Sequence, residues 1–254
     1  MWGVGLNLGL LLSALLLTCN LEASCTHLTY AANPAYPPYH WSPDNHGYMG
    51  ASVDLLQQIL PPETKAVPVV YPWKRALQMA KDGRIDLLLS LRKTPERSEF
   101  LRFTTHRAFP NPIVNFVRRG YLTKLTSWQQ LIPLHGGISR GDTFGGGFDG
   151  FMKEQLTIEE AATMAENFDK LKRARIDYFI TSQYAGIFYL QEIGRSHEIA
   201  AIHPHISDES IYFGFSRKSS CQEMEPYLSK RLAELDQAGQ LELLLAKYLH
   251  GPLD

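Results

Sequence analysis

Residues 71–104, YPWKRALQMAKDGRIDLLLSLRKTPERSEFLRFT, form the stretch that decides the fold. Apolar residues recur at helical spacing from Trp73 onward, and Gly83 is a helix stop, so its first part predicts a helix. The run RIDLLLSL is apolar almost throughout, which is typical of a strand buried in a parallel sheet. TPER then predicts a second helix start, with Thr94 as N-cap and Pro95 at the first helical position.

The alternation of strand and helix continues on both sides of this stretch. HLTYAANPAYPPYHW and AVPVVYP begin as strands, and between them GASVDLLQQILPP predicts an amphipathic helix that the double proline ends. This alternation is the pattern of an α/β sheet wound by right-handed crossovers. After RAFPNPIVNFVRRG the pattern restarts, and GRIDLLLS and ARIDYFIT look like one element used twice. The sequence therefore predicts two similar α/β lobes, with the chain crossing between them around Val117 and again around Tyr212.

The composition is that of a globular protein without a strong charge. The chain has 254 residues, of which 44% are hydrophobic and 20% charged, and its formal net charge is -1. A chain without a basic excess offers no field for nucleic acid or an anionic membrane, so we expect neither as a partner. Its 12 tyrosines, 12 phenylalanines and 4 tryptophans suit stacking on a ligand, although most aromatic residues fill the core.

The N-terminus predicts a secretory signal peptide. An apolar run extends from Leu8 to Leu17 and is followed by small residues up to Ala23. This run is short for a membrane span, which needs about 20 apolar residues. We expect cleavage after Ala23, so residues 1–23 are the signal peptide. No lysine or arginine precedes the apolar run, and an uncleaved anchor is the alternative.

Two of the three cysteines remain after this cleavage. Cys19 leaves with the signal peptide, whereas Cys25 and Cys221 stay in the mature chain. In an oxidising compartment two thiols favour a disulfide, and two separate buried thiols are the alternative.

One pair of histidines has the spacing of metal ligands. His203 and His205 flank a proline, but no third and fourth ligand follow nearby in the sequence. A structural metal site needs such a set, so we expect neither a metal nor another cofactor.

With these elements in place, four stretches resemble family 3 of the bacterial extracellular solute-binding proteins, which includes periplasmic polar amino acid receptors of ABC importers. The stretches are NPAYPPYHW…GYMGASVDLL, residues 71–104, RIDYFITS, and FGFSRK…LSKRLAELDQAGQLELLLAKYL. Together they span nearly all of the mature chain. The PWKRAL form resembles a divergent branch of the family.

The resemblance implies an α/β, two-lobed periplasmic-binding-protein fold of type II, whose lobes are joined by a two-strand hinge and close on a ligand. Residues 24–117 and 212–254 would form lobe one, and residues 118–211 lobe two. Cys25 and Cys221 then share a lobe, which permits their disulfide. The resemblance also implies a small-molecule ligand, an inner-membrane ABC permease as partner, a monomer and a periplasmic location.

Arg97 is the principal candidate for ligand binding. In the family, the arginine at this place forks onto the α-carboxylate of the ligand, with help from the amides of the helix N-terminus. A cation in the first turn of a helix opposes the helix dipole, so helix stability does not account for Arg97. The alternative is a surface arginine paired with Glu96 or Glu99.

Other residues of the first lobe match ligand-binding positions. Tyr36 and Trp73 fall where the family stacks aromatic rings on the ligand, although Trp73 also fits the apolar face of a helix. Asn33 falls where relatives often have an acid, so an amide favours a neutral polar ligand. Ser90, near the end of the buried strand, is also placed among the ligand-binding residues.

The second lobe contributes a glycine-rich turn and one departure from the family. Asp142 and Thr143 lie in SRGDTFGGG, where relatives bind the carboxylate with backbone and hydroxyl groups; a flexible loop is the alternative. Ser182 stands where the family has the aspartate that holds the α-ammonium. A hydroxyl cannot neutralise a buried ammonium. Either Asp142 or Glu209 takes this role, or the ligand is not a standard α-amino acid.

A receptor without enzymatic activity is the favoured function. Cyclohexadienyl dehydratases also resemble this family, and in that alternative Asp142, Glu209 or His40 would donate a proton in the cleft. A third possibility is a ligand sensor that acts on a partner receptor instead of an importer.

Overall fold

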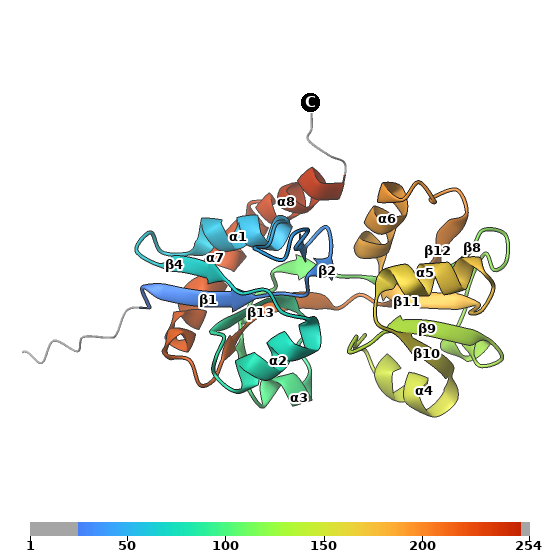
Figure 1. The fold of residues 1–254 in the computed structure, drawn as a ribbon, viewed down its shortest axis with the longest axis horizontal. Helices are drawn as coiled ribbons and strands as arrows, with labels where there is room; N and C mark the ends of the chain where they lie inside the picture. The colour runs from blue at the N-terminus through green and yellow to red at the C-terminus, as the bar shows by residue number, and fades with distance from the viewer. Residues whose placement is uncertain (1–24, 250–254) are drawn as a thin grey trace, which may run out of the picture.

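The computed structural model describes residues 25–249, so the predicted signal peptide lies outside the described residues. Within this range the chain forms two lobes that lie side by side, each with its own sheet (Figure 1). Helices cover both faces of each sheet, because each strand alternates its side chains between two apolar clusters. The predicted two-lobed α/β fold is confirmed.

The first lobe is built on a mixed sheet. Its strands are β1 (His27–Ala31), β4 (Lys65–Pro68), β5 (Leu87–Leu91), β6 (Leu101–Phe103), β7 (Phe109–Pro110) and β13 (Ser210–Ser216). They follow the order β4–β1–β5–β13–β6, and β7 pairs with the start of β13. A separate hairpin is formed by β2 (Ala35–Tyr36) and β3 (His40–Trp41). As RIDLLLSL predicts, β5 is buried throughout; it pairs parallel with β1 on one edge but antiparallel with β13 on the other.

Helices from both ends of the chain cover this sheet. They are α1 (Ala51–Ile59), α2 (Trp73–Lys81), α3 (Pro95–Ser98), the 3₁₀ helix η2 (Ser220–Met224), α7 (Glu225–Gln237) and α8 (Gln240–Leu249). Apolar residues of α1, α7 and α8 pack on one face, and those of α2 pack on the other. Gly239 adopts a φ of 70° between α7 and α8, which explains the interruption of the C-terminal helix.

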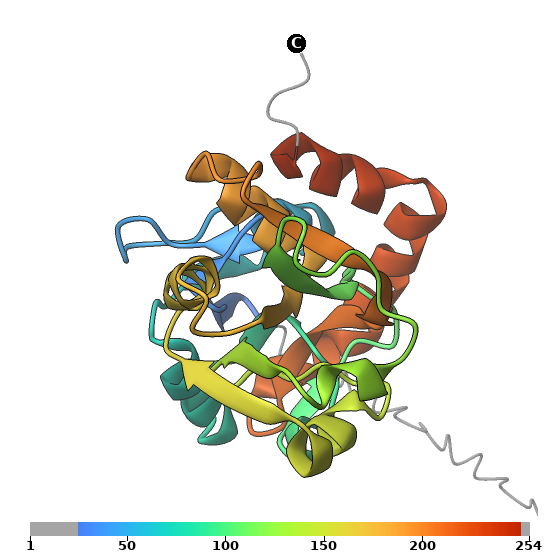
Figure 2. The same ribbon diagram turned by 90° about the vertical axis from the view of Figure 1, so that its right-hand side faces the viewer.

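The second lobe repeats this construction. It contains β8 (Ile113–Arg118), η1 (Trp128–Leu131), β9 (His135–Ser139), α4 (Phe148–Gln155), β10 (Thr157–Ala161), α5 (Met164–Lys172), β11 (Tyr178–Ser182), α6 (Gln183–Glu192) and β12 (Ile199–Ser207). The strand order is β10–β9–β11–β8–β12 (Figure 2). Ile113 and Val117 of β8 face the cluster around α4, whereas Val114 and Phe116 face α5 and α6.

The chain crosses between the sheets at two short segments. It leaves β7 and enters β8 through Asn111–Pro112, and it leaves β12 and enters β13 through Asp208–Glu209. The expected crossing points, Val117 and Tyr212, fall inside β8 and β13, which pair with their own sheets there. The reason is physical: the apolar run that contains Val117 is a strand paired on both edges, whereas Asn111 stands between two prolines.

A disulfide joins Cys25 to Cys221, as predicted, across a sequence separation of 196 residues. It ties the segment before β1 to η2, which precedes α7. The alternative of two separate buried thiols is therefore wrong for this structure.

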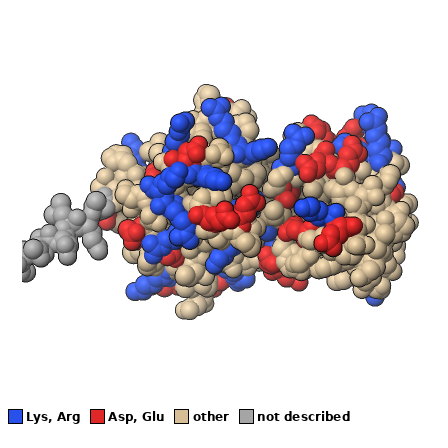
Figure 3. All heavy atoms as spheres, turned by 90° about the horizontal axis from the view of Figure 1, so that it is seen from below, with Lys and Arg blue, Asp and Glu red and all other residues tan. Residues whose placement is uncertain are grey.

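Two features are absent from residues 25–249. In this part of the chain no helix is long and apolar enough to cross a membrane. Nor does it contain a group of three or more histidine, cysteine, aspartate or glutamate side chains arranged to hold a metal ion. On the face drawn in Figure 3, lysine and arginine side chains alternate with aspartate and glutamate.

Candidate ligand-binding site

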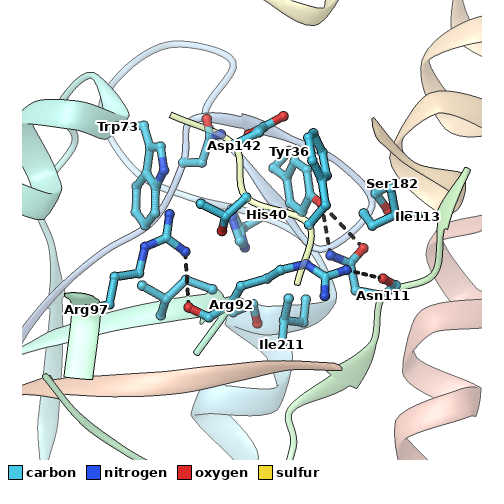
Figure 4. A pocket seen from close by; sticks show the side chains of 15 residues that line it. Tyr36, His40, Trp73, Arg92, Arg97, Asn111, Ile113, Asp142, Ser182 and Ile211 are labelled. Atoms are coloured by element: carbon cyan, nitrogen blue, oxygen red, sulfur yellow. Dashed lines mark hydrogen bonds between the residues drawn. The ribbon is translucent and has the colours of Figure 1, made fainter. Parts of the chain in front are cut away.

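A small cavity lined by both charged and apolar side chains lies between the lobes. Its volume is about 50 Å³, which is room for a few water-sized groups. All eight residues predicted to bind a ligand line it: Asn33, Tyr36, Trp73, Ser90, Arg97, Asp142, Thr143 and Ser182. Figure 4 shows lining side chains from both lobes, together with Asn111 of the first crossing segment. The tertiary structure thus brings together residues that lie up to 149 positions apart in sequence, from Asn33 to Ser182.

Arg97 is buried at this cavity and is only 8% exposed. As predicted, Thr94 caps α3 by accepting a hydrogen bond from the Arg97 amide (3.2 Å), and Pro95 is the first helical residue. The guanidinium donates to the carbonyl of Arg92 at 3.1 Å and, across the cleft, to that of Gly141 at 3.4 Å. Burial lowers the pKa of Arg97, and the charge of Asp142 opposes this shift. The alternative of a surface arginine is wrong.

Asp142 faces the arginines from the second lobe. Its carboxylate has no hydrogen-bond or ion-pair partner among residues 25–249. Burial raises its pKa from 3.8 to about 7, although the charges of Arg97 and Arg92 lower it. The cavity therefore places an acid that is half protonated near neutral pH opposite a buried, permanently charged guanidinium.

Ser90 owes its orientation to a β-bulge. The pairing of β13 with β5 shifts register here, and Ser90 adopts a φ of 45°, which is rare outside glycine. Its hydroxyl contacts that of Ser52 on α1 at 2.6 Å, and Ser52 contacts Nδ1 of His40 at 3.4 Å. Burial lowers the pKa of His40 to about 3, so the ring is neutral at pH 7. The hydrogen-bonded series Ser90–Ser52–His40 therefore presents a hydroxyl to the cavity but no charge.

Two aromatic side chains frame the cavity. The hydroxyl of Tyr36 is hydrogen-bonded to Asn111 (3.1 Å to Nδ2), and its ring stacks on Tyr39. Trp73 lines the cavity and also packs on the apolar cluster of α2, so its place in the core is confirmed and its stacking on a ligand stays a prediction. Asn33 accepts from the amide of Ala35 at 3.0 Å, which fixes the turn before Tyr36.

The remaining predicted residues have mixed environments. Ser182 caps α6 by accepting from the amide of Ala185 at 3.4 Å. The hydroxyl of Thr143 is buried without a hydrogen-bond partner in the described part of the chain. An unpaired buried hydroxyl costs about 1–3 kcal/mol, which a bound acceptor would recover.

Arg92, which was not predicted from the sequence, is 4% exposed and lines the same cavity. Its guanidinium donates to Glu209 at 3.2 Å and to the carbonyl of Asn111 at 2.8 Å. The only sequence signal was an arginine two residues after the strand residue Ser90. Nothing in the spacing distinguished it from the exposed Lys93 that follows.

Two wider clefts adjoin the cavity and share Trp73 and Asp142 with it. One, of about 450 Å³, extends past Tyr71 and Met164, and the other, of about 430 Å³, extends past Lys81 and Glu160. Trp73 and Asp142 therefore stand where the small cavity meets the two wider clefts.

Two sheets joined by two crossing segments, with a cavity between them, define the periplasmic-binding-protein fold. The chain belongs to the bacterial extracellular solute-binding proteins, family 3, whose family model matches residues 28–251. The resemblance inferred from the sequence is confirmed. A search of curated protein sequences finds no match.

Solved structures share this fold at low sequence identity. The amino acid ABC transporter substrate-binding protein AbpA from Streptococcus pneumoniae, bound to L-arginine, is similar with a TM-score of 0.72 and 17% identity over 88% of this chain and 94% of that one. A histidine kinase sensor domain with similarity to periplasmic binding proteins has a TM-score of 0.73 and 19% identity over 88% and 96%. An ancestral amino acid-binding protein, AncCDT-1, a precursor of cyclohexadienyl dehydratase, has a TM-score of 0.70 and 17% identity over 88% and 96%.

Proposed function

We propose that this protein captures a small carboxylate-bearing solute, an amino acid or a derivative, between its lobes and delivers it to an ABC importer. One observation carries the proposal: the buried guanidinium of Arg97 faces the unpaired carboxylate of Asp142 across an interlobe cavity. Binding proteins among the fold neighbours support it, including one whose structure contains L-arginine.

The carboxylate of the ligand is assigned to Arg97. A guanidinium has five N–H donors, and Arg97 uses two of them within the protein. The others remain for a planar, bidentate contact with a carboxylate. The hydroxyls of Ser90 and Thr143 are further, uncharged hydrogen-bond donors for the same carboxylate. Tyr36 and Trp73 are assigned to the side chain of the ligand, and Asn33 to a polar group on it.

The amine of the ligand is assigned to Asp142. Ser182 offers only a hydroxyl, which already caps α6. Glu209 is already paired with Arg92 and accepts from the amide of Gly146. Of the two acids considered for this role, Asp142 alone has an uncommitted carboxylate. A desolvated ammonium needs such a counter-ion.

Calorimetry can test this assignment once a ligand is found by a thermal-shift screen of amino acids, opines, polyamines and small carboxylates. Because the pKa of Asp142 is about 7, pairing it with an ammonium should release a proton near pH 7. Repeating the titration in buffers of different ionisation enthalpy measures that proton. Proton uptake would instead indicate that the ligand is a carboxylic acid without an amine and that it binds beside protonated Asp142.

A pair of variants sharpens the test. Asp142→Asn should weaken an amine-bearing ligand strongly and a matched ligand without the amine little. Adding Ser182→Asp, which keeps a capping oxygen on α6, should recover part of the affinity. Equal losses for both ligands would contradict the role of Asp142.

The proposed importer role implies export of the protein. The predicted signal peptide, residues 1–23, would direct it to the periplasm, and the lobes would present the ligand to an inner-membrane permease. The monomeric state belongs to the same proposal. Intact mass and size-exclusion analysis of the exported protein test cleavage after Ala23 and the monomer.

A dehydratase on this fold is the second candidate, and the raised pKa of Asp142 is the observation that favours it. A carboxylic acid with a pKa of about 7 suits a proton donor. His40 does not suit that role, because it is neutral at pH 7. Turnover of a cyclohexadienyl acid that is lost in Asp142→Asn would support the enzyme; saturable binding without turnover supports the receptor.

A further inference from the structure

Arg92 touches both segments that cross between the lobes. From the end of β5, its guanidinium donates to the carbonyl of Asn111 in the first crossing and to the carboxylate of Glu209 in the second. The crossings also contact each other, because the Asn111 amide donates to the carbonyl of Glu209 at 3.2 Å. One buried cation thus holds both crossing strands at the base of the cavity.

Glu209 reaches from this cation to the second lobe. One carboxylate oxygen pairs with Arg92 at 3.2 Å, and the other accepts from the backbone amide of Gly146. Gly146 belongs to the same loop as Asp142 and Thr143, between β9 and α4. The carboxylate therefore connects an arginine of the first lobe with the ligand-facing loop of the second.

The glycines of this loop make the contact possible. Gly145, Gly146 and Gly147 all have positive φ, of 72°, 59° and 81°. A Cβ atom at Gly145 would lie 2.0 Å from a carboxylate oxygen of Glu209, whereas one at Gly147 would have no heavy atom within 4 Å. Gly145 is therefore required by the close approach of Glu209, and Gly147 only by the backbone conformation.

We propose that Glu209 is an interlobe latch and Arg92 its positioning residue. Arg92 fixes the carboxylate at the hinge, and the carboxylate holds the glycine loop of the second lobe against the first. When the lobes separate, the contact of Glu209 with Gly146 must break, because it joins the crossing segment to a loop of the second lobe; the contact of Arg97 with Gly141 breaks with it. Arg92 to Glu209 persists, so the latch stays oriented for the next closure.

Small-angle scattering on the unliganded mature protein tests the latch without a ligand. Glu209→Ala removes it, and Gly145→Ala displaces the carboxylate. Both should raise the radius of gyration by about 1 Å above the roughly 17 Å of a compact chain of this length. Gly147→Ala is the matched control, since it imposes the same backbone strain without meeting Glu209, and it should scatter like the wild type.

The radii of gyration of the three variants distinguish the latch from its alternatives. Opening in Glu209→Ala and Gly145→Ala, but not in Gly147→Ala, supports the latch. An unchanged radius in the first two variants overturns it, and so does equal opening in all three, because strain in the loop would then be the cause. The measurement contains no ligand, so its result stands independently of the proposed transport function.

Discussion

The guanidinium of Arg97 and the carbonyl of Gly141 meet across the cleft, with 3.4 Å between Nη2 and the oxygen. The first lies on a helix start of lobe one and the second on the glycine-rich loop of lobe two. A residue that binds ligand and also touches the opposite lobe favours closure when the ligand is present. Substitution of Arg97 should therefore affect ligand binding directly.

Arg97→Ala should cost about 2–5 kcal/mol of ligand binding, as expected for truncating one partner of a buried charge pair. Arg97→Lys should recover only part of it, because an ammonium cannot form the bidentate contact. The free energy of unfolding should fall by no more than about 1 kcal/mol, since losing two hydrogen bonds is offset by no longer burying a cation. Calorimetry and chemical denaturation measure the two quantities. Unchanged affinity in Arg97→Ala would remove Arg97 from the site.

Asp142 should make stability depend on pH. Its folded pKa of about 7 lies above its usual 3.8, so the folded protein binds the proton more tightly than the unfolded chain. The resulting stability is fully present below about pH 4 and is lost as pH rises through 7. Relative to Asp142→Asn, the wild type should therefore lose on the order of 4 kcal/mol between pH 4 and pH 8. Urea denaturation at each pH measures the free energy of unfolding of both proteins. The same pH dependence in the wild type and in Asp142→Asn would contradict the raised pKa.

The disulfide should carry a large part of the stability. Cys25 and Cys221 close most of the described chain into one loop, and the loop-entropy model assigns such a bond about 5 kcal/mol. The double variant Cys25→Ser/Cys221→Ser should lose about this amount in urea denaturation. Non-reducing mass analysis of the exported protein checks the bond itself. Two thiols that react with alkylating agent in denaturant would show that it does not form.

Two helical glycines of the second lobe should respond in opposite ways to alanine. A Cβ at Gly186 of α6 would lie 2.2 Å from the ring of Phe116, whereas at Gly150 of α4 it would meet nothing within 4 Å. Gly186→Ala should therefore cost about 1–3 kcal/mol by overpacking, and Gly150→Ala should gain about 0.5–1 kcal/mol. Thermal unfolding of the two variants compares them directly. A stable Gly186→Ala would mean that α6 can shift away from β8.

Much of the site could be predicted because a few sequence positions report on local geometry. Thr94 and Pro95 mark a helix start whatever surrounds them, and an arginine placed there against the dipole signals a use other than stability. Arg92 gave no such signal. Its burial depends on Asn111 and Glu209, which the fold brings to it from 19 and 117 positions away.

The sequence by itself determined the alternation of strands and helices, the two-lobed fold and the cysteine pair. These follow from hydrophobic periodicity, turn residues and composition, which act over a few residues at a time. Only the tertiary structure decided where the chain crosses between lobes, which way Ser90 points and what Glu209 holds. They depend, in that order, on which strands β8 pairs with, on the register shift between β5 and β13, and on the close approach of Glu209 to Gly145. Contacts of that kind are set by how the finished sheets pack, and no short stretch of sequence contains them.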